Sequence, residues 1–231
     1  MLCAPAVLVS GCAFGVASPA KYLASNRATV NGRVFTNRPA GERVRFHFEY
    51  GKTTAYGTQF GYGDVVPNGV GGGDYDLATK LTGLEPGTTY HYRLCGGDRE
   101  NEGAPGCVGD QTFSTPSTTG PYLTLLSSCK LPNGSFGDGL NITATGFPPA
   151  TPVDGGTPVS IDYAVNGEGF QSGALGRTNS DGDVNLNTRW FTNKDIDVWD
   201  VRAYIDPNFN IILDPGEHVA ATGRLEDTCT P

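Results

Sequence analysis

The sequence holds few of the residues on which enzyme chemistry depends. It has three histidines and one methionine among 231 residues. No Gly-x-Ser-x-Gly elbow of a serine hydrolase is present, and the Gly71–Gly73 run is not followed by the Gly-Lys-Ser/Thr of a phosphate-binding loop. The six cysteines lack the Cys-x-x-Cys spacing of common zinc sites. We therefore expect a protein that is not an enzyme.

Positive charge is also scarce. The chain carries 16 Lys and Arg against 24 Asp and Glu, a net charge of −8. Nucleic-acid binding rests on basic side chains that neutralise phosphates, so this balance argues against a nucleic-acid partner. The excess is uneven, since residues 24–117 carry a net charge of −1 and residues 118–231 a net charge of −8. Cations are the natural small partners of the second half.

No long stretch of the chain has the apolar period of a helix. Instead, 33 glycines and 16 prolines separate short runs in which apolar and polar residues alternate. In Arg43–Tyr50 the apolar side chains fall on one face, and Arg45, His47 and Glu49 fall on the other. This pattern predicts an all-β protein with many turns, and the length allows two domains.

One segment, Leu81–Cys95, carries a specific structural pattern. A Pro-Gly corner separates two strands, and Tyr90 lies six residues after Leu84, the spacing of a tyrosine corner. The segment resembles the same region of exported bacterial (actinobacterial-type) fibronectin type III domains. Such domains are usually extracellular spacers or binding modules, so the resemblance implies an extracellular or cell-surface location.

The second half resembles a different β-sandwich. Gly146–Val153 is similar to a loop of bacterial immunoglobulin-like domains. Together the two resemblances imply two tandem antiparallel β-sandwiches, fibronectin type III-like over residues 24–117 and immunoglobulin-like over residues 122–231. Residues 118–121 would form the linker between them, since turn-forming residues gather there.

The N-terminus is apolar and free of charge as far as Val16. We expect residues 1–20 to form an export signal, too short for a stable membrane anchor. Val9–Cys12 resembles a bacterial lipobox, which predicts lipidation of Cys12 after cleavage. The alternatives are cleavage near Ala17 or an uncleaved apolar segment.

Four cysteines remain if Cys3 is removed with the signal and Cys12 is lipidated. In an exported protein an even number favours disulfides, and three pairings are possible. Closeness within each domain favours Cys95–Cys107 and Cys129–Cys229. Each bond would contribute about 2–4 kcal/mol to stability.

The segment 206–217 has the ligand spacing of an EF-hand calcium loop. Oxygen donors stand at positions 1, 3, 5, 9 and 12, and a backbone carbonyl serves at position 7. The predicted Ca²⁺ ligands are Asp206, Asn208, Asn210, Ile212, Asp214 and Glu217. Position 6 is Ile211, where such loops require glycine because φ is positive. The alternative is a polar loop between two strands, with no metal.

Two further segments have open interpretations. If the strands that carry His47 and His91 are neighbours, their outward residues form one charged patch, which we expect to be a solvated sheet face. The glycine-rich stretch Gly61–Asp76 is expected to be a loop, either for recognition or as a tolerated insertion.

Three classes of function remain open, and the first is the leading one. It is an exported adhesion or binding module, or a spacer, and we expect it to be a monomer. Its partner would be an extracellular protein or a glycan. It would contact a membrane only through a lipid anchor. The second is a carbohydrate- or small-ligand-binding module. The third, accessory domains of a hydrolase, lacks motifs in its support. The aromatic candidates for sugar binding are Tyr56, Tyr62, Tyr75, Trp190 and Trp199, although alternation places Trp199 in the core.

Overall fold

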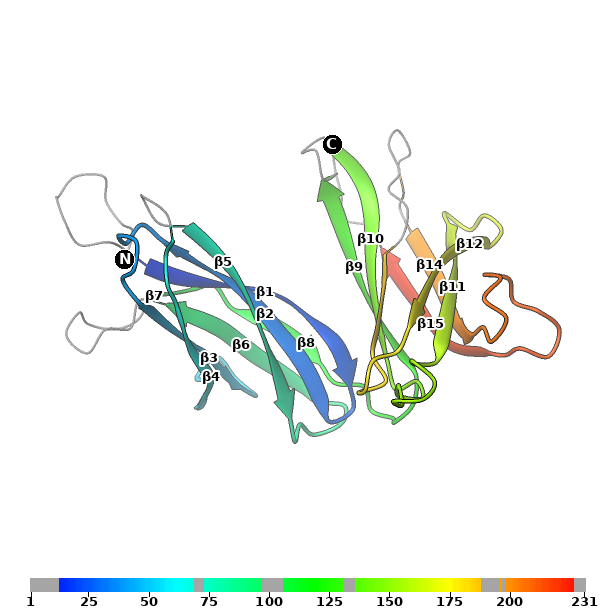
Figure 1. The fold of residues 1–231 in the computed structure, drawn as a ribbon, viewed down its shortest axis with the longest axis horizontal. Coiled ribbons are helices and arrows are strands. Elements are labelled where there is room, and N and C mark those ends of the chain that lie inside the picture. The colour runs from blue at the N-terminus through cyan, green and yellow to red at the C-terminus, as the bar shows by residue number, and fades with distance from the viewer. Residues whose placement is uncertain are drawn as a thin grey trace. The chain divides into compact units, whose positions relative to one another are not determined.

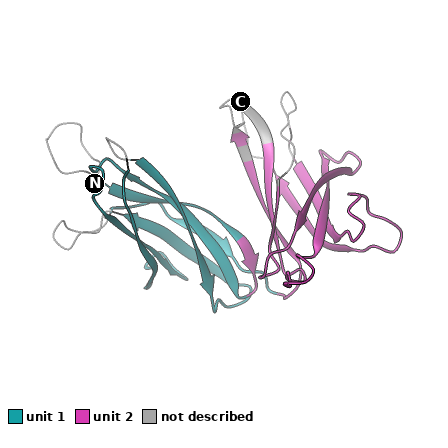
Figure 2. Cartoon of the chain, in the orientation of Figure 1, with its two compact units in different colours: residues 1–21, 26–117 teal, residues 22–25, 118–231 magenta. Residues whose placement is uncertain are grey.

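Alternating apolar residues become paired strands throughout the computed structural model of the protein (Figure 1). The structure describes residues 13–68, 73–96, 106–130, 136–187, 196 and 198–226. Over these residues the chain is all-β, and none of them forms a helix long and apolar enough to cross a membrane. The chain divides into two compact units, one of residues 1–21 and 26–117 and the other of residues 22–25 and 118–231 (Figure 2).

The strands of the first unit follow one another at short intervals. They are β1 (Ala13–Ala24), β2 (Arg27–Thr36), β3 (Val44–Gly51), β4 (Thr58–Val65), β5 (Gly73–Thr82), β6 (Thr89–Gly96), β7 (Gly106–Val108) and β8 (Gln111–Ser114). Hydrogen bonds join them in the order β4-β3-β6-β7-β1-β2-β5, and β8 also pairs with β6. β1 pairs with β7 in parallel, with Gly15 opposite Cys107, whereas the pairs β2–β5, β3–β4, β3–β6, β6–β7 and β6–β8 are antiparallel. Val30, Val34, Phe48, Tyr92 and Leu94 are buried in its core.

The first strand overlaps the predicted export signal. Residues 13–20 lie in β1, where Ala17, Ala20 and Leu23 are buried. The strands of the first unit therefore begin before residue 24, the boundary expected from the sequence. Residues 1–12, which include the predicted lipidation site Cys12, lie outside the described residues.

The glycine-rich segment is mostly strand, and the prediction of a loop over Gly61–Asp76 is wrong for residues 61–65 and 73–76, whereas residues 66–68 lie in no strand. Residues 61–65 belong to β4 and residues 73–76 to β5. β5 pairs with β2 along its whole length, from Gly73 opposite Thr36 to Thr82 opposite Arg27. Backbone pairing thus outweighs the low strand propensity of glycine here.

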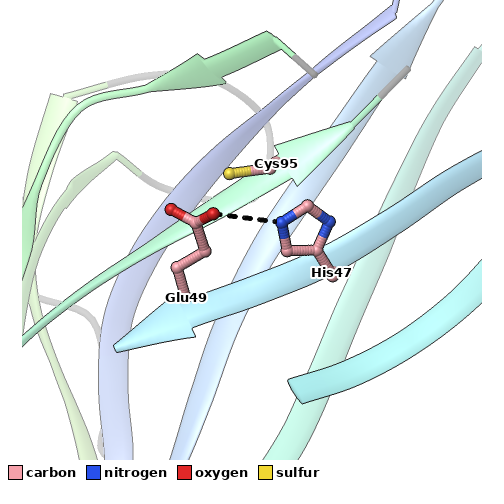
Figure 3. Close-up of side chains that lie close together, drawn as sticks. All are labelled: His47, Glu49 and Cys95. Atoms are coloured by element: carbon pink, nitrogen blue, oxygen red, sulfur yellow. Dashed lines mark hydrogen bonds and ion pairs between the residues drawn. The ribbon is translucent and has the colours of Figure 1, made fainter. Parts of the chain in front are cut away.

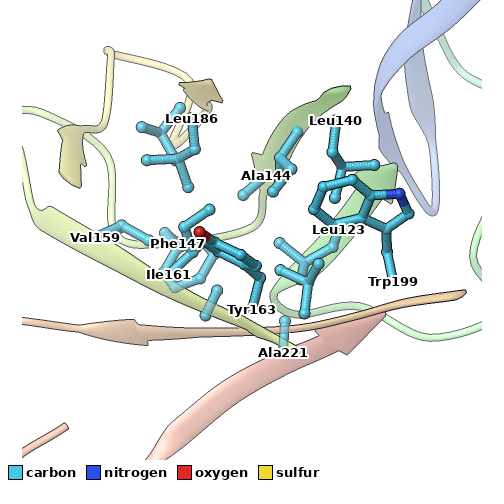
Figure 4. Packing of buried hydrophobic residues seen from close by; sticks show 14 of the residues in the cluster. Leu123, Leu140, Ala144, Phe147, Val159, Ile161, Tyr163, Leu186, Trp199 and Ala221 are labelled. Atoms are coloured by element: carbon cyan, nitrogen blue, oxygen red, sulfur yellow. The ribbon is translucent and has the colours of Figure 1, made fainter. Parts of the chain in front are cut away.

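The second unit contains two sheets. Its strands are β9 (Tyr122–Lys130), β10 (Phe136–Thr145), β11 (Pro158–Val165), β12 (Gln171–Arg177), β13 (Val184–Asn187), β14 (Val198–Ile205) and β15 (Val219–Glu226). One sheet has the order β13-β10-β9 and the other β12-β11-β14-β15. Both lie over one core that includes Ile142, Ile161, Leu186, Trp199 and Val201, part of which Figure 4 shows.

Candidate functional site

The predicted calcium segment is the connection between β14 and β15. Asp206 follows the last residue of β14 and is fully buried. Its Oδ2 accepts hydrogen bonds from the Ser160 hydroxyl at 2.7 Å and from the Ile211 backbone N–H at 2.9 Å, and its Oδ1 accepts one from the Asn210 N–H at 3.3 Å. Burial raises the pKa of Asp206, but these hydrogen bonds outweigh burial and the pKa is lowered.

The backbone of this loop has a positive φ at two residues. Ile211, at position 6, has φ 58°, and Phe209, at position 4, has φ 60°. Both values lie in the left-handed region, which is costly for a β-branched residue. The Asp206 carboxylate holds the turn by accepting the Ile211 N–H, while the Ser172 hydroxyl donates to the Ile211 carbonyl. The Arg177 guanidinium lies 4.3 Å from the centre of the Phe209 ring.

Hydrogen bonds connect the remaining predicted ligands to one another. Both Asn208 Nδ2 and Asn210 Nδ2 donate to Asp214 Oδ2, at 2.6 and 2.8 Å. The Asp214 backbone N–H donates to Glu217 Oε2 at 3.0 Å, and the Ile212 N–H donates to Asn210 Oδ1. The loop is thus ordered by its own polar groups.

The oxygen donors and the backbone turn of this loop suit a hard cation such as Ca²⁺. The side chains, however, do not converge on one point. Its three carboxylates are not drawn together as a metal cluster, although all three lie in the described part of the chain. Two asparagine amides point their N–H groups at Asp214, where a cation would need their oxygens. Rotation of these two amides would supply those oxygens, since both side chains are exposed.

Another group of metal-ligand types lies in the first unit. The ligand atoms of His47, Glu49 and Cys95 all lie within 4.8 Å of one another (Figure 3). However, Cys95 is bonded to Cys107 in a disulfide, so it offers no thiolate. The cluster consequently leaves one imidazole and one carboxylate, fewer protein ligands than a zinc site needs.

The charged patch on β3 and β6 differs from the expected solvated face. The two strands are neighbours, and Glu49 lies opposite Arg93. The correction concerns His47, which is 2% exposed rather than solvated. The ring of Tyr62 stacks on its imidazole, and the Glu49 carboxylate accepts a hydrogen bond from His47 Nε2 at 3.3 Å. His91, farther along β6, pairs with Asp110 at 2.8 Å.

The structural elements predicted around this face are present. The Glu85 backbone N–H donates to the Tyr90 hydroxyl at 2.9 Å, which is the tyrosine-corner contact, and Leu84 is buried beside it. The Cys95–Cys107 disulfide joins residues that lie directly opposite each other in β6 and β7. Cys129 is also disulfide-bonded.

Several predicted residues stand elsewhere. Trp199 is fully buried in the core of the second unit, as alternation indicates, and is not available for sugar stacking. Trp190 and Cys229 lie outside the described residues. Sequence reasoning missed Asp162, a buried carboxylate that binds Arg202 at 2.6 Å and accepts the Tyr204 hydroxyl at 3.1 Å. An aspartate within the apolar run of β11 was the available signal.

Comparison with known proteins finds similar structures but no matching family and no matching curated protein. The sensor domain of the anti-sigma factor RsgI4 of Pseudobacteroides cellulosolvens has 15% identity and a TM-score of 0.34, over 46% of this chain and 92% of that one. A two-domain fibronectin type III segment of chicken tenascin has 13% identity and a TM-score of 0.24, over 94% and 100%. CBD12 of CALX1.2 has 12% identity and a TM-score of 0.24, over 79% and 76%. At these values the likeness says nothing of what this chain binds.

Proposed function

We propose that this chain is an exported, non-enzymatic binding module or spacer whose second unit binds Ca²⁺ through residues 206–217. The observation that carries the calcium proposal is the left-handed backbone at Ile211. A β-branched residue adopts this conformation at a cost of about 1–2 kcal/mol, so the surrounding contacts must favour the turn. The turn is the one that brings alternate oxygen donors to one point in an EF-hand loop.

The ligands would be the side chains of Asp206, Asn208, Asn210, Asp214 and Glu217 with the carbonyl of Ile212. Bound Ca²⁺ would supply positive charge to three carboxylates in an acidic half of the chain. The role of the ion is structural, because it would connect the end of β14 to the start of β15.

An extracellular location is supported by the Cys95–Cys107 disulfide, since such bonds persist in oxidising compartments. The burial of residues in β1 bears on how the chain would be processed. Cleavage near Ala17 would remove the first part of β1, whereas cleavage just before Cys12 would leave the strand whole. We propose the second, with lipidation of Cys12, and N-terminal mass spectrometry of the exported protein tests it.

The calcium proposal is tested by thermal unfolding of the oxidised protein followed by tryptophan fluorescence. Both tryptophans belong to residues 118–231, so the signal reports on the second unit. With a dissociation constant of about 10⁻⁴–10⁻³ M, Ca²⁺ at about 10 mM should stabilise this unit by about 1.4–2.7 kcal/mol. That corresponds to a rise in Tm of about 5–10 °C.

Asp214→Asn and Glu217→Gln should abolish the rise. Asp200→Asn is the matched control, because it removes one carboxylate from β14 outside the loop and should keep the rise. A wild-type Tm that does not change at millimolar Ca²⁺ would refute calcium binding and leave a metal-free connection between two strands.

A further inference from the structure

A β-bulge in β4 places Tyr62 on the outer face of the first unit. Gln59 lies opposite Glu49 before the bulge, and Asp64 lies opposite Arg45 after it. Gly61 and Tyr62 therefore share one partner position, and Gly61 has φ 62°. Because a bulge adds one residue, it reverses which side chains point outward. Gln59, Tyr62 and Asp64 consequently share the outer face.

The Tyr62 ring is exposed and fixed in position. Tyr62 is 64% exposed, the largest fraction among the exposed aromatic residues of the described chain. One side of the ring stacks on the His47 imidazole, with centroids 5.3 Å apart and an angle of 27° between the planes. The hydroxyl donates to Gln59 Oε1 at 2.6 Å. An aromatic surface is thus presented to solvent with few rotamers left to lose on binding.

Hydrogen bonds extend from Tyr62 across three strands. Gln59 Nε2 donates to Glu49 Oε1 at 2.9 Å, and the Arg93 guanidinium donates to Glu49 Oε2 at 2.7 Å. The guanidinium in turn lies 4.3 Å from the centre of the Tyr56 ring. Two tyrosines are therefore linked by one ordered polar network, and Figure 3 shows its central carboxylate, Glu49.

A hollow of about 330 Å³ adjoins Tyr62. It is lined by Arg45, Phe46, Tyr62, Gly63 and Asp64. This volume lies within the range of about 300–1,000 Å³ that is typical of small-ligand sites. The lining combines an aromatic ring with one acidic and one basic side chain, so it offers both an apolar surface and hydrogen-bonding groups.

The charges on this face are balanced within it. Arg43 lies 3.4 Å from Asp64, and Arg93 lies 2.7 Å from Glu49. His91 likewise pairs with Asp110. A polyanion would need an excess of positive charge, which this face does not have. The chemistry therefore favours a neutral ligand that both donates and accepts hydrogen bonds.

We propose that this outer face of β3, β4 and β6, centred on Tyr62, binds the sugar rings of a neutral polysaccharide. A pyranose ring has a face of C–H groups that packs on an aromatic ring, and its hydroxyls form hydrogen bonds with carboxylates, amides and guanidinium groups at the rim. The inference rests on the proposed role of the chain as an extracellular binding module and names its ligand class.

The test is native affinity electrophoresis of the oxidised protein. The gels contain hydroxyethylcellulose, xylan, galactomannan or dextran, with polygalacturonate and a polysaccharide-free gel for comparison. The wild type should be retarded by at least one neutral polysaccharide. Tyr62→Ala should weaken binding about tenfold or more, as expected when a central aromatic contact is truncated. Tyr122→Ala, an exposed tyrosine in the second unit, should migrate like the wild type.

Two results would overturn the proposal. One is unretarded migration of the wild type in every neutral gel, and the other is full retention of binding in Tyr62→Ala. Retardation by polygalacturonate alone would also contradict it, because the charge argument would then be wrong. Arg45→Ala, at the hollow, provides a second variant if Tyr62→Ala has a lowered Tm. The calcium experiment reports on the second unit, and the polysaccharide experiment reports on the first unit. Each proposal can therefore fail separately.

Discussion

Replacement of Asp206 should destabilise the second unit even when calcium is absent. Its carboxylate accepts hydrogen bonds from Ser160, Ile211 and Asn210, and both Asp206 and Ser160 are fully buried. Asp206→Ala leaves the Ser160 hydroxyl and the Ile211 N–H without their acceptor. A hydrogen bond to a charged group contributes about 1.5–3 kcal/mol, and the two short ones therefore predict a loss of about 3–6 kcal/mol.

The assay is urea unfolding of the second unit, followed by tryptophan fluorescence in EDTA. Ser160→Ala should cost about 1–3 kcal/mol, and the double variant should cost less than the sum of the two single ones, because they share a hydrogen bond. A loss below about 1 kcal/mol for Asp206→Ala would refute the reasoning, since the carboxylate would then contribute little to the turn. Because of this cost, Asp206→Ala cannot separate metal binding from folding. The half-buried ligands Asp214 and Glu217, farther along the loop, are the better positions for that test.

The pH dependence of this interaction has a defined sign. The pKa of Asp206 is lowered in the folded protein, so its stabilising contribution is complete above the unfolded pKa of about 3.9. The contribution is lost as the pH falls through the folded pKa. Wild type and Asp206→Ala should therefore approach equal stability in acid. A constant difference down to the lowest pH at which both remain folded would contradict this assignment.

Three further predictions concern the first unit, whose unfolding can be followed by near-ultraviolet circular dichroism. Tyr90→Phe removes the tyrosine-corner contact and should lower the free energy of unfolding by about 1–2 kcal/mol; an unchanged value would contradict the role of its hydroxyl. Replacement of Cys95 and Cys107 by serine together should cost about 2–4 kcal/mol in a calorimetric measurement, and no loss would show that the bond does not restrict the unfolded chain. Burial raises the pKa of Glu49, but hydrogen bonds from Arg93 and two neighbours outweigh it and lower the pKa, so stability should fall as the pH drops below about 4.3. Glu49→Gln should flatten that dependence, and an equally steep acid loss in the variant would assign it to other groups.

Much of the architecture follows from alternation and turn chemistry. The polar segment 206–217 is typical of a connection between two strands, and it joins β14, which ends at Ile205, to β15, which starts at Val219. The tyrosine corner was likewise readable from Leu84 and Tyr90. These features are local, so spacing along the chain is enough to predict them.

The features that sequence reasoning missed depend on partners distant in the chain. His47 is buried because the bulge at Gly61 turns Tyr62 onto it, and strict alternation would have placed Tyr62 inward. In the same region, the high number of glycines wrongly indicated a loop. Gly63 lies in β4, where a Cβ would come within 2.5 Å of the Phe46 ring, so the absence of a side chain permits close packing in a strand. The small apolar residues of β1 similarly fit both an export signal and a buried strand.

The pairing of β1 with β7 limits when the first unit can finish folding. Gly15, in the first strand of its unit, finds its partner Cys107 near the end of that unit. Contacts so distant in sequence form late, because a long loop must close before they contribute. A chain emerging from the ribosome cannot complete this unit until β7 has been made. During that interval the apolar residues of β1 lack part of their final packing, so β1 is a segment that a chaperone could bind.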